Sequence, residues 1–310
     1  MSTILITDSL FLPVGGADEQ RLRAAGYDID RLDVPKADEA ALIEHVAGKV
    51  GYLLGGIEEI TGAVVAAADQ LEAIAFTGSG YREFIPAWEA ATSRGIAISA
   101  ARGANASAVA DWALVSGLAL IRNIPALTSP GGLDFTIGRD FDSLSLGIVG
   151  FGAVGHALAK KARSLGLSVM VSGVSDSDDV ASVELAELVA SADIVSVHVS
   201  KNRGHDALDA VSIAAMKVGA VLVNAAFDGA INNAALIRRL QAGELRAAVD
   251  YPLDAGDIRP GVLLASNAQT AYNTVEANAR VASRATSSLL NLLSTGDDVD
   301  LVNPDFKNHR

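Results

Sequence analysis

Short apolar runs alternate with amphipathic stretches along most of this chain. In the first hundred residues the strand candidates are "TILIT", "YDIDRLD", "GYLLG", "EAIAF" and "IAIS". The stretches between them, "ADEQRLRAAG", "ADEAALIEHVAG" and "REFIPAWEAATSRG", have apolar residues at helical spacing and end close to a glycine. This pattern predicts short strands that alternate with helices, which is typical of a parallel sheet covered by helices.

The same alternation starts again near Ser145. "SLGIVG", "LSVMV", "DIVSVHV", "AVLVNA" and "RAAVD" are predicted strands, and a helical stretch lies in each gap between them. "NASAVADWALVSGLALIRN" separates the two series and is predicted to form one long helix with Asn105 as its N-cap. "TSPGGLDFTIGRDFDS" follows and is predicted to be a loop. We therefore expect an α/β protein with two parallel sheets.

A glycine motif opens the second series. Gly150, Gly152 and Gly155 lie between a predicted strand and a predicted helix, with the spacing GxGxxG of dinucleotide-binding proteins. The second glycine of such a motif lets the backbone approach a pyrophosphate, and the helix N-terminus presents free N–H groups to the anion. The next strand normally ends on an acid that binds the ribose, whereas here it ends on Ser172 and Gly173. The motif predicts a bound dinucleotide.

Composition narrows the class of protein. With 310 residues the chain is long enough for two domains that each bury a core. The formal net charge of −13 disfavours nucleic acid and anionic membrane surfaces as partners. Cysteine is absent, which excludes a thiolate metal site, and no metal site is expected. The N-terminal "MSTILITDSL" lacks the pattern of a signal peptide and no apolar run is as long as a membrane span, so we expect a cytoplasmic protein.

The order of the motifs resembles that of the D-isomer-specific 2-hydroxyacid dehydrogenases. "ATSRGIAIS" followed by "GANASAVADWAL" is similar to the family's entry into its interdomain helix, and "LGIVGFGAVG" is similar to its nucleotide loop. "AAMKVGAVLVNAA", "ALIRRLQAGELRAAVD" and "TVEANARVASRATSSLLNLL" match later landmarks in the family's order. The resemblance covers nearly the whole chain.

This resemblance implies a fold and a division into domains. The expected fold is a Rossmann-type doubly wound parallel sheet together with a second, flavodoxin-like α/β domain. Residues 1–104 and 285–310 would form the substrate domain, and residues 105–284 would form the dinucleotide-binding domain. The resemblance also implies a small-molecule substrate, bound in the cleft between the domains, and a homodimer.

The same resemblance implies where the cofactor binds. The expected contacts are Gly150, Gly152, Ala153, Val154, Gly155, Ser172, Gly173, His198, Val199, Ser200, Ala225, Ala226 and Asp250. Asp250 matches the family's aspartate that contacts the nicotinamide amide. Gly173 stands at the position of the ribose-binding acid, while the following "VSDSDD" offers no arginine for a 2′-phosphate. NAD is therefore the expected cofactor, and NADP stays open.

The family's three catalytic residues have no match in this sequence. The family uses an arginine that orients the substrate carboxylate, and a histidine oriented by a glutamate. Phe227 in "VNAAFDG" stands at the arginine position, and Leu253, with Asp254 beside it, stands at the glutamate position. Gln269 in "ASNAQTAYN" stands at the histidine position. Gln269 can donate or accept a hydrogen bond but cannot carry a proton at neutral pH, and Phe227 cannot bind a carboxylate.

Other residues near the expected cleft are candidates for the missing roles. Arg102 in "AARGANA" stands where the family commonly has proline and could be a relocated anion anchor, although a surface arginine explains it too. Asn105 is kept from the family, but helix capping alone would account for it. Gly55 and Gly56 in "YLLGGIEE" match the family loop whose backbone N–H groups meet the substrate carboxylate, and a plain tight turn is the alternative.

Proton carriers are few. Tyr272 is a candidate catalytic phenol, as are Tyr81 and Tyr251, but a phenol with a pKa near 10 needs a neighbour that tunes it. Asp254 and water are the other possible sources of a proton. The histidines other than His198 are expected to be structural or solvated: His45, His156, His205 and His309.

Two hypotheses follow from these observations. In the first, the protein is a nicotinamide-dependent oxidoreductase whose substrate is not a simple 2-hydroxy acid, because Phe227 suggests a less anionic reacting end. In the second, it is a scaffold without turnover that binds nucleotide as a sensor or interaction protein. The persistence of the glycine loop and of Asp250 favours the first.

Overall fold

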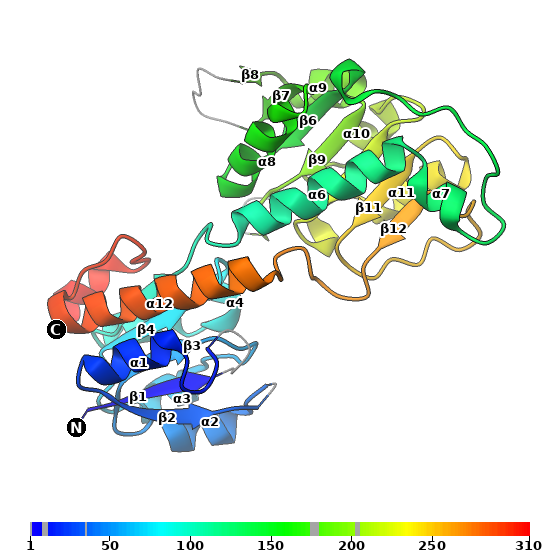
Figure 1. Ribbon diagram of the computed structural model, residues 1–310. Coiled ribbons are helices and arrows are strands. Elements are labelled where there is room, and N and C mark those ends of the chain that lie inside the picture. The colour runs from blue at the N-terminus through cyan, green and yellow to red at the C-terminus, as the bar shows by residue number, and fades with distance from the viewer. Residues whose placement is uncertain (1, 8–11, 35, 174–179, 202–204) are drawn as a thin grey trace. The chain divides into compact units, whose positions relative to one another are not determined.

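The computed structural model describes the whole chain except residues 1, 8–11, 35, 174–179 and 202–204. The chain forms two compact units, each a parallel sheet with helices on both faces (Figure 1). The first unit consists of Met1–Asn105 and Thr274–Arg310, and the second of Ala106–Asn273. The predicted α/β class with two parallel sheets is confirmed.

The first unit has five strands in the order β2-β1-β3-β4-β5. The strands are β1 (Thr3–Thr7), β2 (Asp28–Leu32), β3 (Lys49–Leu54), β4 (Ala73–Phe76) and β5 (Ala97–Ala100). The helices are α1 (Ala17–Ala24), α2 (Glu39–Val46), α3 (Gly62–Ala67), α4 (Tyr81–Phe84), α5 (Trp88–Ser93), α12 (Val275–Thr295) and the 3-10 helix η4 (Pro304–His309).

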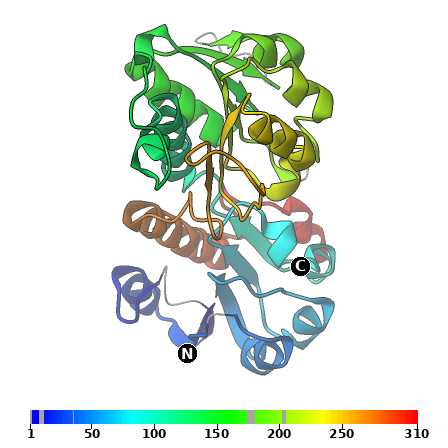
Figure 2. The ribbon, with the colours of Figure 1, turned by 90° about the vertical axis from the view of Figure 1, so that its right-hand side faces the viewer.

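Alternate side chains of each strand serve two cores in this unit. Ile4 and Ile6 of β1 pack with α1 and α12, whereas Leu5 belongs to the cluster that includes α2 and α3. Figure 2 shows the sheet of this unit with α12 on one face and α2 on the other. Burial on both faces explains why β1, β3, β4 and β5 are nearly continuous apolar runs, whereas the edge strand β2 is not.

The second unit has seven strands in the order β12-β11-β10-β9-β6-β7-β8. The strands are β6 (Ser145–Val149), β7 (Ser168–Ser172), β8 (Ala181–Ser182), β9 (Ile194–Val197), β10 (Val221–Asn224), β11 (Arg246–Val249) and β12 (Leu263–Ala265). The helices are α6 (Ala106–Ile121), α7 (Ile124–Thr128), α8 (Ala153–Ser164), α9 (Leu185–Ser191), α10 (Ala210–Ala215), α11 (Asn233–Gln241) and the 3-10 helices η1 (Phe141–Ser143) and η3 (Asp228–Ala230).

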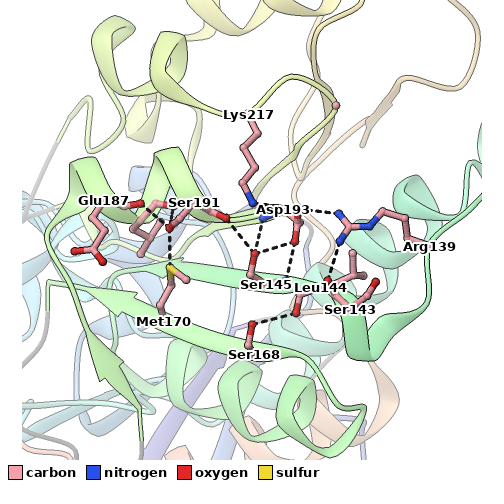
Figure 3. Close-up of polar contacts among 12 residues, drawn as sticks. Arg139, Ser143, Leu144, Ser145, Ser168, Met170, Glu187, Ser191, Asp193 and Lys217 are labelled. Atoms are coloured by element: carbon pink, nitrogen blue, oxygen red, sulfur yellow. Dashed lines mark hydrogen bonds and ion pairs between the residues drawn. The ribbon is translucent and has the colours of Figure 1, made fainter.

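One acid joins three segments at the amino ends of β6 and β9. Asp193 accepts hydrogen bonds from the Arg139 Nη1 atom at 2.8 Å, from the Ser145 backbone N–H at 2.9 Å and from the Lys217 Nζ atom at 3.3 Å (Figure 3). Burial raises the pKa of Asp193, but these hydrogen bonds outweigh it and hold the pKa at about 2. The network anchors the long connection between α7 and β6 to the sheet.

The observed elements differ from the expectations in three places. The predicted helix "REFIPAWEAATSRG" is two helices, α4 and α5, because Pro86 lacks the N–H that a continuous helix needs. The short strands β8 and β12 were not predicted. The expected domain boundary between residues 284 and 285 falls inside α12, which packs on the first unit as one unbroken helix, and the boundary lies at Thr274 instead.

Candidate functional site

The glycine loop lies at the carboxyl end of β6, where parallel sheets of this type bind ligands. Gly150 has a φ of +88°, and a Cβ at this position would lie 2.6 Å from the carbonyl oxygen of His198. A Cβ at Gly155 would lie 2.7 Å from the carbonyl oxygen of Gly150. Backbone conformation and packing therefore require glycine at both positions.

Gly152 differs from its two partners in the motif. Its φ is −82°, and a Cβ built on it would have no neighbour within 4 Å. It precedes α8, and its carbonyl accepts hydrogen bonds from the backbone N–H and the Nδ1 atom of His156. Nothing among the described residues requires glycine there, whereas a pyrophosphate lying against the helix N-terminus does. The loop therefore fits a dinucleotide.

The predicted ribose edge has no acid within the described residues. β7 ends at Ser172, whose carbonyl accepts the N–H of Gly150 at 2.9 Å, and Gly173 follows with a φ of +87°. A Cβ at Gly173 would lie 3.8 Å from the Gly150 nitrogen, so this edge adjoins the glycine loop. The "VSDSDD" segment, residues 174–179, lies outside the described residues.

His198 supports the loop from β9. Its N–H donates to the carbonyl of Val149 at 2.8 Å, and its Nε2 atom shares a hydrogen bond of 2.8 Å with the hydroxyl of the buried Ser196. Burial lowers the pKa of His198 to about 4, so the ring is neutral at pH 7. Val199 and Ser200 continue this edge, with Val199 packed on the core and Ser200 exposed.

A tight segment after β10 carries Ala225 and Ala226. The fully buried Asn224 holds it: Oδ1 accepts the N–H of Ala226 at 3.0 Å, and Nδ2 donates to the carbonyl of Phe227 at 3.0 Å and to the Tyr251 hydroxyl at 3.2 Å. Ala225 and Ala226 are half-buried, while Asn224 and Phe227 on either side are buried. The two alanines are therefore the open part of this segment.

Asp250 fixes the loop that follows β12. Its carboxylate is buried and accepts the backbone N–H groups of Thr270 at 3.0 Å and of Ala271 at 2.9 Å. The Nε2 atom of Gln269 then donates to the carbonyl of Ala226 at 3.2 Å. The predicted histidine and arginine positions of the family, Gln269 and Phe227, are thus held side by side within the second unit.

Phe227 is buried in the core of the second unit and is 5% exposed. The ring of His205 packs edge-to-face on it with 5.7 Å between centroids, and the Lys201 ammonium lies 5.9 Å from the ring centre. His205 is exposed, but it is not a purely solvated residue as expected, because of this contact. An imidazole and an ammonium thus adjoin Phe227, the residue that is predicted to stand at the family's arginine position.

The other candidate proton donors in the second unit differ in their exposure. Tyr251 is buried, its hydroxyl donates to the Asn233 Oδ1 atom at 2.8 Å, and burial raises its pKa to about 12, so it is a poor proton donor. Tyr272 is exposed. Asp254 is exposed and accepts the N–H of Gly256, while Leu253 packs against the core.

The first-unit candidates lie at the carboxyl ends of its strands. Gly55 and Gly56 follow β3 and are buried, and Arg102 follows β5 and is exposed. Asn105 directly precedes α6, but no hydrogen bond from its side chain is found among the described residues. Tyr81 packs edge-to-face on Trp88.

Sequence reasoning missed Glu58, which follows the two glycines. Its side chain is 1% exposed, and its Oε1 atom accepts the hydroxyl of Tyr52 at 3.2 Å. Tyr52 is fully buried and its oxygen lies 3.2 Å from the Thr7 hydroxyl. Burial and the Glu58 carboxylate raise the pKa of Tyr52 well above its usual value. The neighbouring Ile57 is 58% exposed. Hydropathy would therefore have predicted the opposite burial of Ile57 and Glu58 in this loop.

The described residues contain no cluster of three or more histidine, aspartate or glutamate side chains that could hold a metal ion. Within the same part of the chain, no helix is long and apolar enough to cross a membrane.

Comparison with known proteins places this architecture. Residues 126–255 match the family model for the NAD-binding domain of D-isomer specific 2-hydroxyacid dehydrogenase. (S)-sulfolactate dehydrogenase of Chromohalobacter salexigens is 29% identical over 301 residues, which cover 91% of this chain and 95% of that enzyme. D-3-phosphoglycerate dehydrogenase of Haemophilus influenzae is 30% identical over 254 residues, or 76% of this chain and 60% of the enzyme.

A solved structure, the TT0316 protein of Thermus thermophilus, superposes with a TM-score of 0.81 at 27% identity. The superposition covers 97% of this chain and 99% of that one. The matches agree with the two-sheet architecture and with the nucleotide loop at the end of β6. The chain therefore belongs to the D-isomer-specific 2-hydroxyacid dehydrogenase family, and its second unit carries the family's NAD-binding domain.

Proposed function

We propose that this protein is an NAD-dependent oxidoreductase with a non-standard active site, whose substrate is not a simple 2-hydroxy acid. The observation that carries the proposal is the pairing of Phe227 and Gln269. Phe227 is buried and apolar at the family's arginine position, and Gln269 is tied to the carbonyl of Ala226 at the family's histidine position. Neither side chain can orient a carboxylate by charge or transfer a proton at neutral pH.

The cofactor would lie along the carboxyl edge of the second sheet. Gly152 and the N-terminus of α8, from Ala153 and Val154, would hold the pyrophosphate, while Ala225 and Ala226 would lie under the nicotinamide. Bound NAD supplies the hydride acceptor, and NADH the hydride donor. The carboxylate oxygens of Asp250 accept hydrogen bonds from the loop of Thr270 and Ala271. Asp250 would therefore act on the cofactor indirectly, by holding that loop in place.

The substrate would be oriented by hydrogen bonds instead of by an arginine. Gln269 keeps one N–H and its amide oxygen for a substrate carbonyl or hydroxyl. Arg102 and Asn105 have side chains without partners among the described residues and are the candidates from the first unit, and Tyr272 is the exposed phenol. The proton would come from water or from His205, whose ring packs on Phe227.

We also propose a homodimer. Between α7 and η1, three large apolar side chains are strongly exposed: Leu133 at 45%, Phe135 at 81% and Ile137 at 84%. Exposed apolar residues gathered on one segment are typical of a protein interface. The partner that covers this segment would be a second copy of this chain. The dimer would lie in the cytoplasm, where NAD is available.

Nucleotide binding followed by a reduction assay tests the proposal. Melting temperatures are compared with NAD, NADH, NADP and NADPH, and at a hundredfold excess over Kd the bound nucleotide stabilises the protein by about 2.7 kcal/mol. NAD or NADH is expected to give the larger shift. NADH oxidation is then followed with carbonyl compounds that carry no carboxylate.

The second candidate function is a nucleotide-binding scaffold without turnover. Tight NADH binding with no oxidation of NADH by any carbonyl compound would favour the scaffold. Absence of binding by all four nucleotides would contradict both functions.

A further inference from the structure

A cavity of about 310 Å³ lies at the amino ends of β10, β11 and β12, entirely within the second unit. This volume is at the lower end of the range that is typical of small-molecule pockets. The glycine loop lies at the carboxyl end of β6 in the same parallel sheet, so the cavity is at the opposite edge of the sheet from that loop. Its charged lining residues are two arginines and one glutamate.

Arg246, the first residue of β11, is the more buried of the two arginines. Its guanidinium donates hydrogen bonds to the carbonyl of Leu120, to the Asn123 Oδ1 atom at 3.0 Å and to the carbonyl of Gly219 at 2.6 Å. All three acceptors are neutral, and no carboxylate among the described residues forms an ion pair with it. Burial, and to a lesser extent the charge of Arg259, lowers the pKa of Arg246. Arginine nevertheless stays protonated in proteins, so a partly desolvated positive charge remains.

Arg259 is the second cation and is exposed. Its Nη2 atom donates to the carbonyl of Gly243 at 3.1 Å, which is its only hydrogen bond in the part of the chain that the structure describes. A Cβ at Gly243 would lie 2.7 Å from this Nη2 atom, so glycine leaves room for the guanidinium at the cavity wall. Most of the five N–H groups of Arg259 are therefore available to a ligand.

The glutamate of the cavity does not neutralise these two arginines. Glu244 forms its ion pair with the guanidinium of Arg239, which is not a lining residue. The cavity therefore has two positive charges whose partners among the described residues are neutral oxygens only. Charges withdrawn from water are normally paired, so the cavity favours an anion.

We propose that this cavity binds a small phosphate monoester, with the phosphate group held by Arg246 and Arg259. The planar guanidinium donates two parallel N–H groups that match the oxygens of a phosphate. Ala126, Leu133 and Val262 also line the cavity and provide apolar surface for the remainder of the ester. This site goes beyond the proposed oxidoreductase function and does not depend on it.

Calorimetric titrations at constant ionic strength in chloride test the proposal. The probes are monobutyl phosphate, inorganic phosphate and butanol. We expect one monobutyl phosphate to bind per chain, inorganic phosphate to bind more weakly and butanol not to bind, since each buried methylene tightens binding by up to about fourfold. Because the glycine loop is itself expected to attract phosphate, the titrations are repeated in Gly152→Val, where the Kd should stay within about twofold.

Substitutions of the two arginines test the residues directly. Arg259→Gln should raise the Kd of monobutyl phosphate at least about tenfold, because hydrogen bonds from a charged donor are lost. Arg259 is exposed, so this variant should melt at the wild-type temperature. Arg246→Lys should also weaken binding, but it removes hydrogen bonds to main-chain carbonyls and should melt earlier. Arg238→Gln is the matched control: Arg238 is an exposed arginine of α11 that does not line the cavity, and its loss should leave the Kd within about twofold.

A second copy of this chain is the alternative occupant, because Leu133 lines the cavity and also belongs to the proposed dimer interface. An acidic side chain of that copy would then replace the phosphate, neither phosphate probe would bind, and Arg259→Gln would lower the mass found by sedimentation. That result would overturn the proposal. Binding that is lost in Gly152→Val, that is unchanged in Arg259→Gln or that butanol matches would overturn it as well. A protein that never oxidises NADH but shows the expected phosphate binding would contradict only the proposed oxidoreductase function.

Discussion

Gly150, Gly152 and Gly155 share one motif but have different surroundings. A Cβ at Gly150 or Gly155 would lie 2.6 or 2.7 Å from a carbonyl oxygen, whereas one at Gly152 would face open space. A side chain at Gly150 or Gly155 therefore disturbs the fold, while one at Gly152 occupies only the place where a pyrophosphate would lie.

This difference predicts two separable phenotypes. Gly152→Val should abolish NAD binding but lower the free energy of unfolding by no more than about 1 kcal/mol, the cost of a poorer N-cap. Gly150→Ala should destabilise the free protein, because its φ of +88° and the His198 carbonyl exclude a Cβ. Thermal melts with and without NAD measure both, and unchanged NAD affinity in Gly152→Val would contradict the cofactor site.

Phe227 gives the second prediction at this scale. Phe227→Arg should lower the free energy of unfolding by about 3 kcal/mol or more, because it places a charge in the core of the second unit. Phe227→Leu is the matched control and should cost less than about 1.5 kcal/mol. Urea unfolding measures both changes, and an arginine variant as stable as the wild type would show that the position is open to water.

At the scale of single residues, the sequence predicts which side chain stands at each motif position more readily than which contacts that side chain makes. The prediction that Phe227 and Gln269 stand at the positions of the family's arginine and histidine could be made directly from the motifs. The bond from Gln269 to Ala226 and the burial of Glu58 could not, because they depend on which side chains the loops turn inward. In the loop after Gly56 the apolar Ile57 is exposed and the acid is buried, against the usual pattern.

The elements themselves follow closely from periodicity. The ten predicted strands are all present. Most of them are buried on both faces and leave short, nearly continuous apolar runs, which differ from the spaced apolar positions of the helices, whereas the edge strand β2 mixes apolar and charged residues. The break between α4 and α5 at Pro86 was not predicted, because the apolar residues on both sides of the proline keep helical spacing. The two-residue strand β8 is too short to leave any pattern.

The Asp193 network predicts how one edge of the second sheet responds to pH (Figure 3). The folded protein holds the pKa of Asp193 at about 2, below the ordinary 3.8, so ionised Asp193 stabilises the fold by about 2 kcal/mol at pH 7. Because the folded pKa is the lower one, this contribution is complete above about pH 5 and is lost as the pH falls through about 2.

Asp193→Asn should therefore be less stable than the wild type by about 2 kcal/mol at pH 7, and the difference should shrink by about half at pH 3. Urea unfolding of both proteins between pH 7 and pH 3 gives the two curves. A difference that does not change with pH would mean that the charge of Asp193 contributes nothing.

For the whole molecule, the exposed apolar segment predicts assembly. Sedimentation equilibrium should give a mass twice the 31.8 kDa of one chain, and the double variant Phe135→Asp and Ile137→Asp should be monomeric with an unchanged circular dichroism spectrum. The exposed Val211→Asp on α10 is a control that should stay dimeric. A monomeric wild type would contradict the proposed interface.

The central claim is that this chain keeps the family's cofactor site and has lost its chemistry on 2-hydroxy acids. The direct measurement is NADH oxidation with glyoxylate or pyruvate in a protein for which NADH binding has been shown by fluorescence. Loss of the acid/base group and of the carboxylate cation each lowers a rate by about a hundredfold or more, so we expect bound NADH and turnover at least about ten-thousandfold below that of an ordinary dehydrogenase. Ordinary turnover of either keto acid would contradict the account.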